Sequence, residues 1–220
     1  LTAGALDLNA THSGWIIALS AGAAGAKGKQ GTAVAGSVAA TYAAYTVNAE
    51  LRNLPESVSD RSEVAGTVSV KGSDATNLIQ VAGAGSYGGE SGYGAAVSFG
   101  MINNDVNARI TNVKGLYHGG AVTVAAEQTG LIVNVVGSVG VGMDDMGVAG
   151  MLAVNLITNQ VVAEVSNSSN TSDSVGGITV SATDKPVLVT LAGAVGVGEK
   201  AGIGGALAYN LIRDEVRARV

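Results

Sequence analysis

Residues 47–51 read Val-Asn-Ala-Glu-Leu, and versions of this pentapeptide return three times further along the chain. They are VNARI at 106–110, VVAEV at 161–165 and VRARV at 216–220. The last residues of successive pentapeptides lie 59, 55 and 55 positions apart. A regular spacing of this size is typical of a repeat protein, in which each copy buries its apolar face against its neighbours.

Motifs upstream of the pentapeptide recur in the same order. The stretch AVNLI at 153–157 matches AYNLI at 208–212 and, more loosely, SFGMI at 98–102. Likewise, GSVGVG at 137–142 matches GAVGVG at 193–198, and TVSV at 67–70 matches TVAA at 123–126 and TVSA at 179–182. We therefore divide residues 1–220, as a single domain, into four repeats at approximately 1–51, 52–110, 111–165 and 166–220.

The pentapeptide itself has the alternation of a half-buried strand. Val47, Ala49 and Leu51 share one face and Asn48 and Glu50 the other, a period of two with one apolar face. The outward position reads Glu50, Arg109, Glu164 and Arg219 in successive copies, so the sign of the charge alternates. If each copy is one coil of a parallel stack, these side chains form a row about 4.8 Å apart. Opposite charges on neighbouring strands then stabilise by roughly 0.2–1 kcal/mol per pair.

Other segments of a copy also read as strands. In the third copy these are residues 121–126, 131–141, 148–157 and 161–165, with a tip at Asp144 and Asp145 and a polar loop over 166–177. Both faces of 131–141 are apolar or small, which predicts that both are covered. Repeated Gly predicts close approach of another backbone layer. Asn155 and Asn210 share one repeat position, and we expect an internal amide ladder there.

The fold class that these patterns predict is all-β, a parallel β-solenoid (β-helix) of four repeats. One alternative stays open, in which each copy makes two shorter coils and the charged residues lie twice as far apart. Composition agrees with thin stacked sheets, because Gly is 33 of 220 residues and aromatic residues are 4%. The long uncharged stretch 146–163 alternates with period two and contains Asn155, Asn159 and Gln160, so we read it as strand and not as a membrane helix.

Charge and cysteine content restrict the function. The net charge of −5, with 12 scattered Lys and Arg, argues against nucleic acid as a partner. The chain has no Cys, which removes disulfides, zinc-thiolate sites and cysteine nucleophiles. It begins at Leu1 with no signal peptide, and we interpret it as a segment of a longer exported protein.

Candidate chemical motifs are few and lack the context that their chemistry requires. His12-Ser13 resembles part of a hydrolase dyad, but no nucleophile elbow is present, and His12 and His118 have no shared carboxylate neighbour. Residues 83–88 match a phosphate-loop pattern inside a Gly/Ala strand with no helix after them. Asp144 and Asp145 could bind calcium, although solvated turn charges are the simpler interpretation. We therefore predict no catalytic residue, no cofactor and no metal.

The motifs GAVGVG at 193–198, GGALAYNLI at 204–212 and EVRARV at 215–220 resemble the repeat regions of large filamentous adhesins. These are proteins of Gram-negative bacteria of the leukotoxin-like and filamentous-haemagglutinin-like kind, exported by autotransporter or two-partner routes. The resemblance extends over all four copies and is weakest in the first. It implies a rod-like β-helical stalk, secreted or on the cell surface, with no catalytic residues to carry over.

Three functions follow as expectations. The first is an adhesive rod that attaches to a host-cell surface protein or glycan through many weak contacts. The second is the passenger region of a host-cell-damaging leukotoxin. The third is a glycan-acting β-helix enzyme, which would need at least two convergent carboxylates. Uncapped terminal coils also predict end-to-end self-association.

Overall fold

The computed structural model describes residues 2–54, 62–114, 116–169 and 176–220, and every helix or strand assigned among them is a β-strand. We use "coil" for one long strand together with the two shorter strands that follow it. The coils contain, in order, β2 (Leu6–Ala26), β3 (Ala33–Ala43) and β4 (Thr46–Leu54); β6 (Val68–Gly88), β7 (Gly92–Ile102) and β8 (Asp105–Val113); β10 (Val122–Gly142), β11 (Met146–Ile157) and β12 (Gln160–Ser166); and β13 (Ile178–Asp184), β14 (Val187–Gly198), β15 (Ala201–Ile212) and β16 (Glu215–Arg219).

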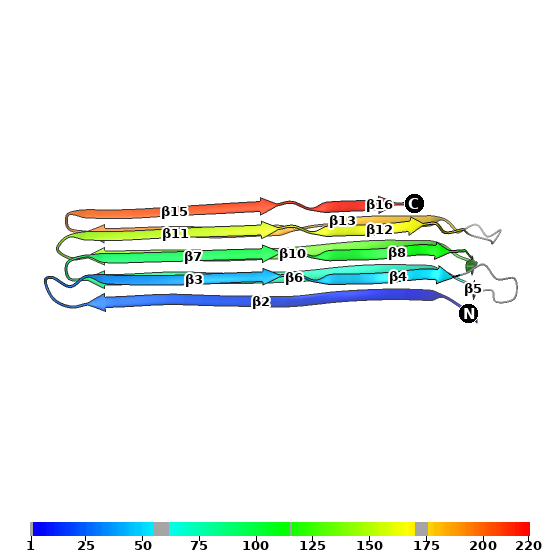
Figure 1. Cartoon of the computed structure of the whole chain (residues 1–220), viewed down its shortest axis with the longest axis horizontal. Coiled ribbons are helices and arrows are strands. Elements are labelled where there is room, and N and C mark those ends of the chain that lie inside the picture. The colour runs from blue at the N-terminus through cyan, green and yellow to red at the C-terminus, as the bar shows by residue number, and fades with distance from the viewer. Residues whose placement is uncertain (1, 55–61, 115, 170–175) are drawn as a thin grey trace.

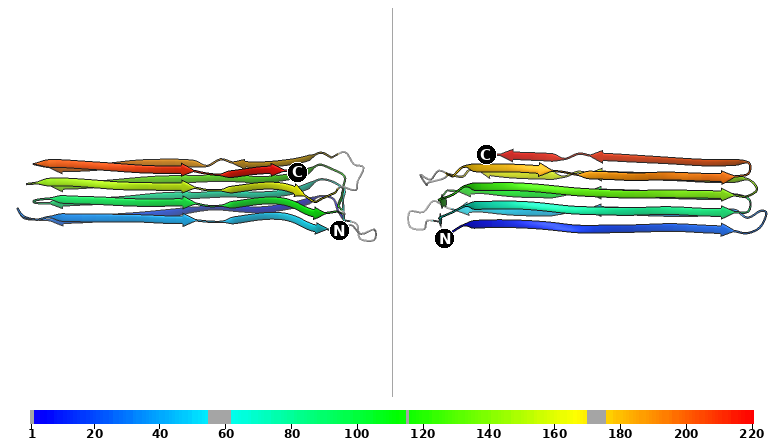
Figure 2. Two further views of the ribbon diagram at one scale, coloured as in Figure 1. Left: turned by 45° about the horizontal axis from the view of Figure 1, so that its top comes forward. Right: turned by 180° about the vertical axis from the view of Figure 1, so that it is seen from behind.

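Each strand pairs in parallel with its counterpart in the next coil. The long strands form one sheet in the order β13-β10-β6-β2, with β14 also on β10. The shorter strands form two four-stranded sheets, β15-β11-β7-β3 and β16-β12-β8-β4. Figure 1 shows the shorter strands in front, and the right-hand view of Figure 2 shows the long strands from behind. The molecule is therefore an all-β parallel solenoid with flattened coils.

The register settles how many coils one sequence repeat makes. Val106 pairs with Val47 on one side and with Val161 on the other, so residues one full repeat apart are hydrogen-bonded neighbours. The alternative with two short coils per repeat is therefore wrong.

The strand boundaries differ from the sequence expectation in the third copy. The two predicted strands at 121–126 and 131–141 are one strand, β10, because β6 pairs with it along its whole length. Only the corresponding segment of the fourth coil is interrupted, between Asp184 and Val187. Pro186 lies in this gap, and Pro has no N–H to donate to the neighbouring strand. A small sheet of β1 (Thr2–Ala3), β5 (Ser62–Val64) and β9 (Leu116–His118) was not predicted.

The interior changes character along the length of a coil. In the half that contains β4, β8 and β12, the core is Val-rich and includes Val47, Val70, Val106, Val124 and Val161. We call the turns at 27–32, 89–91, 143–145 and 199–200 the tips. In the half of each coil that lies near the tips, the core is thin and consists largely of Ala, with Val136 and Met151. A third cluster of Ala43, Leu78, Ile102, Ile132 and Ile157 lies between them.

Close approach of two backbone layers explains the inward Gly residues, as the sequence predicted. A Cβ on Gly140 would lie 2.1 Å from the carbonyl oxygen of Val148 in the facing sheet. At Gly94 the nearest atom would be the carbonyl oxygen of Val139, at 2.5 Å. Only Gly permits this contact between sheets, so these residues determine how thin the tip half is.

The prediction that both faces of 131–141 are covered is wrong. Val136 and Ser138 point into the coil and are buried, whereas Val139, on the other face, is 42% exposed. Leu131, Val133 and Val135 point outward in the same way and are partly buried by their neighbours in adjacent coils. In this strand, apolar residues therefore lie on the outer face as well as on the face toward the core.

Among the described residues, no helix has the length and hydropathy needed to cross a membrane.

Candidate functional site: polar rows along the stack

The four residues of the predicted charge row lie side by side. Glu50 pairs with Arg109, Arg109 with Glu164, and Glu164 with Arg219 in the strand register. Arg219 donates to Glu164 across 3.0 Å, and Arg109 Nε lies 4.0 Å from the same carboxylate. The carboxylate of Glu50 lies 3.5 Å from Arg52, within its own strand. The ion pairs are therefore concentrated around Glu164.

Electrostatics at Glu164 follow from this geometry. The hydrogen bond from Arg219 is the main cause that lowers the pKa of Glu164, with further lowering by the charges of Arg219 and Arg109. Burial acts in the opposite direction but does not cancel these effects. The row thus holds Glu164 ionised between two cations, which suits structural pairing and not proton transfer.

The predicted amide ladder is part of a larger network inside the tip half. Asn155 Nδ2 donates to Asn210 Oδ1 across 3.0 Å and to Thr190 Oγ1 across 2.9 Å. Asn134, on the facing long strand, donates to Asn155 Oδ1 across 2.7 Å. The ladder therefore joins the two sheets as well as successive coils.

Gln80 occupies the position next to Asn134 in the second coil. Its Nε2 donates to Thr41 Oγ1 and to the carbonyl oxygen of Phe99, both across 2.9 Å. A Cβ on Gly100 would lie only 2.4 Å from Gln80 Oε1, so Gly100 makes room for the amide. Sequence reasoning missed Gln80 and Asn134, which lie at inward positions of β6 and β10.

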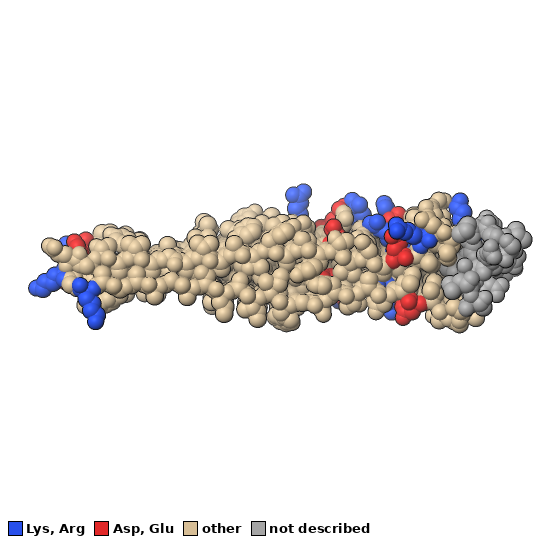
Figure 3. Space-filling view, turned by 60° about the horizontal axis from the view of Figure 1, so that its bottom comes forward, with Lys and Arg blue, Asp and Glu red and all other residues tan. Residues whose placement is uncertain are grey.

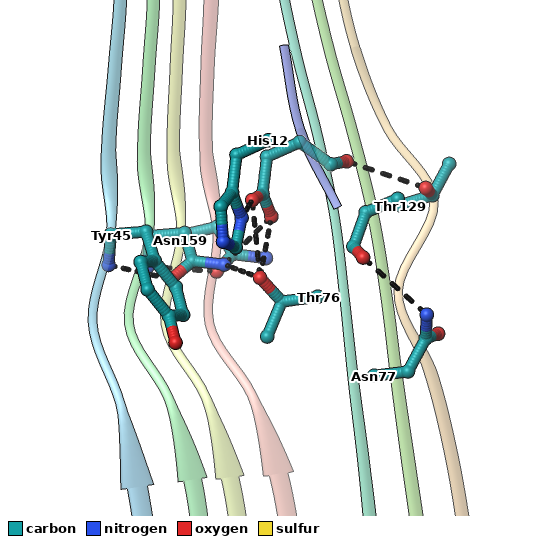
Figure 4. Close-up of polar contacts among 9 residues, drawn as sticks. His12, Tyr45, Thr76, Asn77, Thr129 and Asn159 are labelled. Atoms are coloured by element: carbon teal, nitrogen blue, oxygen red, sulfur yellow. Dashed lines mark hydrogen bonds and ion pairs between the residues drawn. The ribbon is translucent and has the colours of Figure 1, made fainter. Parts of the chain in front are cut away.

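A second polar network crosses the middle of the coils, where each shorter pair of strands is interrupted (Figure 4). His12 Nδ1 lies 2.5 Å from Asp74 Oδ1, and the imidazole stacks on the ring of Tyr45. Thr76 and Asn104 donate to the same buried carboxylate, Asn104 across 2.8 Å. Asp74 thus has three side-chain partners, which offsets the cost of burying a carboxylate.

Side chains at the strand interruptions also satisfy backbone donors of the preceding coil. The N–H of Tyr45 donates to Asn104 Oδ1, that of Asn104 to Asn159 Oδ1, and that of Asn159 to Asp214 Oδ1, across 3.0, 3.2 and 2.8 Å. Buried backbone N–H groups without a partner are costly. The Asn and Asp residues therefore satisfy the backbone donors at the strand interruptions of the first three coils.

Two carboxyl groups come together in the fourth coil. Burial is the main cause that raises the pKa of Asp184 to about 6, and the charge of Asp214 raises it further. Burial also raises the pKa of Asp214. Asp184 occupies the position next to Gln128, which in turn pairs with Asp74. The sequence alone did not distinguish Asp184 and Asp214 from other acidic residues, because only the strand register shows that they lie close together.

A repeated Asn at the strand ends was also missed. Asn53, Asn112 and Asn167 have φ of 57°, 55° and 45°, in the left-handed region that Asn tolerates. Their side chains bond to one another, Asn112 to Asn53 across 3.3 Å and Asn167 to Asn112. The signal was available, since each Asn follows its pentapeptide by two residues.

The remaining candidate motifs lie within β-strands. His12 and Ser13 are adjacent in β2, so they point to opposite faces and do not form a dyad. Residues 83–88 are extended strand within β6, which is not the loop-to-helix geometry of a phosphate site. His118 lies in β9, and its side chain is outside the described part of the structure.

Asp144 and Asp145 lie at a tip with the other turn residues. Asp145 forms an ion pair with Lys200 across 3.2 Å, and its backbone N–H donates to Glu90. Among the described residues, no group of three or more His, Asp or Glu side chains is arranged to hold a metal ion. The side-chain hydrogen bonds described above run between successive coils and between facing sheets, while some buried atoms, among them Gln80 Oε1 and Asp184 Oδ1, have no partner among the described residues.

Comparison with models of known protein families, with curated proteins and with solved structures finds no match to this chain.

Proposed function

We propose that this chain is a structural and adhesive segment of a secreted or cell-surface bacterial protein, a rigid rod for attachment to host cells. The observation that supports the proposal is the unbroken parallel pairing of successive coils, with polar rows that bond along the stack axis. A stack of this kind extends in one direction and keeps its cross-section, as a spacer or stalk requires.

The distribution of polar groups supports a non-catalytic role. Asp74 is buried with its partners inside the coil, and Glu164 is neutralised by Arg219. Asp184 and Asp214 lie together in the terminal coil, and both are partly buried. A glycan-acting enzyme would need two carboxylates on either side of an open groove, separated by roughly 5–9 Å.

Binding of the chain to host cells tests the adhesive part of this proposal. Labelled chain should bind to host cells, and binding should fall when the tip charges Lys27, Lys29, Glu90, Asp144, Asp145, Glu199 and Lys200 are replaced by Ser. The tips are the charged groups farthest from the main body of charge (Figure 3), and they project from each coil at the same end. Contacts repeated on every coil would add by avidity.

A control variant replaces two exposed charged residues at the opposite end, Arg52 and Lys114, by Ser and should bind as the unmodified chain does. If the chain binds no better than the tip variant, the segment does not attach to cells itself. A spacer role would then remain, and the adhesive role would be contradicted.

A further inference from the structure

Both outer faces of the tip half lack charge over a long, continuous area. No Asp, Glu, Lys or Arg occurs within 15–26, 33–43, 77–88, 92–102, 131–142, 146–157, 187–198 or 201–212. These segments comprise β3, β7, β11, β14 and β15 and the parts of the long strands that face them. Figure 3 shows this uncharged stretch between the charged tips and the charged half.

Apolar side chains on these faces are exposed even in the inner coils. Leu19 and Leu207, in the outermost coils, are 74% and 64% exposed. Val97, which has a neighbouring coil on each side, is still 38% exposed. Exposure is therefore a property of the faces and not only of the ends of the stack. Contiguous apolar patches of this extent mark interaction surfaces.

Outward Gly residues divide each face into grooves and ridges. The row Gly36, Ala95, Gly150 and Gly205 lies between larger rows, one of which is Val38, Val97, Leu152 and Leu207. A Cβ on Gly36, Gly150 or Gly205 would meet no atom within 4 Å. Ala95 carries a methyl group in the same row, so the fold itself does not require Gly there. On the long-strand face, a Cβ on Gly83 or Gly137 would have no contact closer than 3.9 Å.

We propose that copies of this chain pack side by side through these faces, sheet against sheet, with apolar ridges of one copy entering the Gly grooves of the next. Strands of 11 residues at about 3.3 Å per residue, four strands wide at about 4.8 Å, give each face about 700 Å². A stable interface buries about 800 Å² per partner, so one face supplies almost the whole area. No charge is buried in this contact.

The open edges of the sheets favour a second copy over a lipid bilayer. The outer strands β2, β14 and β15 have open edges, and unpaired backbone groups are not tolerated in hydrocarbon. Lateral packing leaves these edges in water. Because both faces of the slab are apolar, packing on one face leaves the other free, and association continues beyond a dimer. The inference does not depend on the adhesive role.

Sedimentation velocity over a range of concentrations tests the proposal. The unmodified chain should form species larger than a dimer as concentration rises. Val97→Lys with Leu152→Lys should raise the dissociation constant by about tenfold or more, because each bound copy would bury unpaired charge. The control is Ser73→Lys with Gln160→Lys, which adds the same charge in the charged half of the coil and should associate as the unmodified chain does.

Gly150→Leu separates lost association from lost folding. A Cβ at this position has no atom of its own chain within 4 Å, so thermal unfolding in dilute solution should not shift downward, while association weakens by about tenfold or more because the groove is filled. A chain that stays monomeric at all concentrations would overturn the proposal, and so would unchanged association of Gly150→Leu. Flotation of the monomer with neutral phosphatidylcholine vesicles would overturn it in favour of a bilayer.

Discussion

At the scale of single residues, the Gly positions fall into two kinds with opposite physical consequences. Gly140 faces the opposing sheet, where a Cβ would lie 2.1 Å from a carbonyl oxygen. Gly137, three residues earlier in β10, faces outward, where the nearest atom to a Cβ would be 3.9 Å away. The same residue type therefore sets the sheet spacing at one position and shapes the surface at the other.

This difference predicts opposite effects of the same substitution. Gly140→Ala should lower the free energy of unfolding by about 1–3 kcal/mol, since the sheets must separate to admit the methyl group. Gly137→Ala should raise it by about 0.5–1 kcal/mol, because Ala loses less conformational freedom on folding. Chemical denaturation of the two variants in dilute solution measures both values. Equal changes in the free energy of unfolding would contradict the conclusion that Gly140 sets the distance between the sheets.

Asp184 gives a prediction about pH. Burial raises the pKa of Asp184 from 3.8 to about 6, so the folded chain holds its proton more tightly than the unfolded chain. Stability is therefore greatest below about pH 4 for this group and falls as pH rises through about 6. Asp184→Asn should remove this loss and stabilise the protein at pH 7 by about 1 kcal/mol, a value reduced for solvent screening of a half-exposed group.

Thermal unfolding between pH 4 and pH 8 checks this effect. Glu164→Gln serves as the contrast, because the pKa of Glu164 is lowered and its contribution is lost as pH falls instead. A pH profile that Asp184→Asn leaves unchanged would show that this carboxyl group is not perturbed in the folded chain.

At the scale of a strand, the alternating charge row predicts that a single reversal is costly. Arg109→Glu places a third carboxylate between Glu50 and Glu164 and removes the hydrogen bond from Arg109 to Asn107. The free energy of unfolding should fall by about 0.5–1 kcal/mol at low salt, and by less at high salt. Arg109→Gln removes the attraction without adding repulsion, so its free energy of unfolding should lie between those of Arg109→Glu and the unmodified chain. The same loss at high and low salt would argue against an electrostatic origin.

The elements that could be predicted from sequence are those with a clear period. The pentapeptide predicted a half-buried strand with one apolar face, and the register of the strands then showed that Val106 pairs with Val47 and Val161. The Gly/Ala strands were harder, because apolar residues occupy both faces, and only the register shows which face lies inside. For the same reason the amides of Gln80 and Asn134 could not be assigned to a network in advance.

The ends of the strands depend on where Pro occurs as well as on the pattern of apolar residues. Residues 127–130 of the third copy lie outside the strands that the sequence predicts, yet β10 continues through them because β6 pairs with β10 along its whole length. In the fourth coil Pro186 removes a donor, and the strand does break there. Neighbouring strands therefore decide the continuity of a strand unless a Pro prevents pairing.

At the scale of the whole molecule, stability comes from contacts between neighbouring coils. The inner coils, with β6, β7, β10 and β11, are paired on both sides, whereas β2 and β15 are paired on one side only. In such a stack the free energy is approximately a sum of coil terms and nearest-neighbour terms, so the ends open first.

Amide hydrogen exchange should resolve this gradient coil by coil. We expect amides of β2 and β15 to exchange at least about tenfold faster than those at the matching positions of β6 and β11, since local opening breaks one interface instead of two. Lateral packing through the outer faces leaves this order unchanged, because it adds no backbone partner to either edge. End-to-end pairing of copies would instead protect β2 and β15 as concentration rises. Uniform exchange across all coils at low concentration would mean that the stack opens as one cooperative unit.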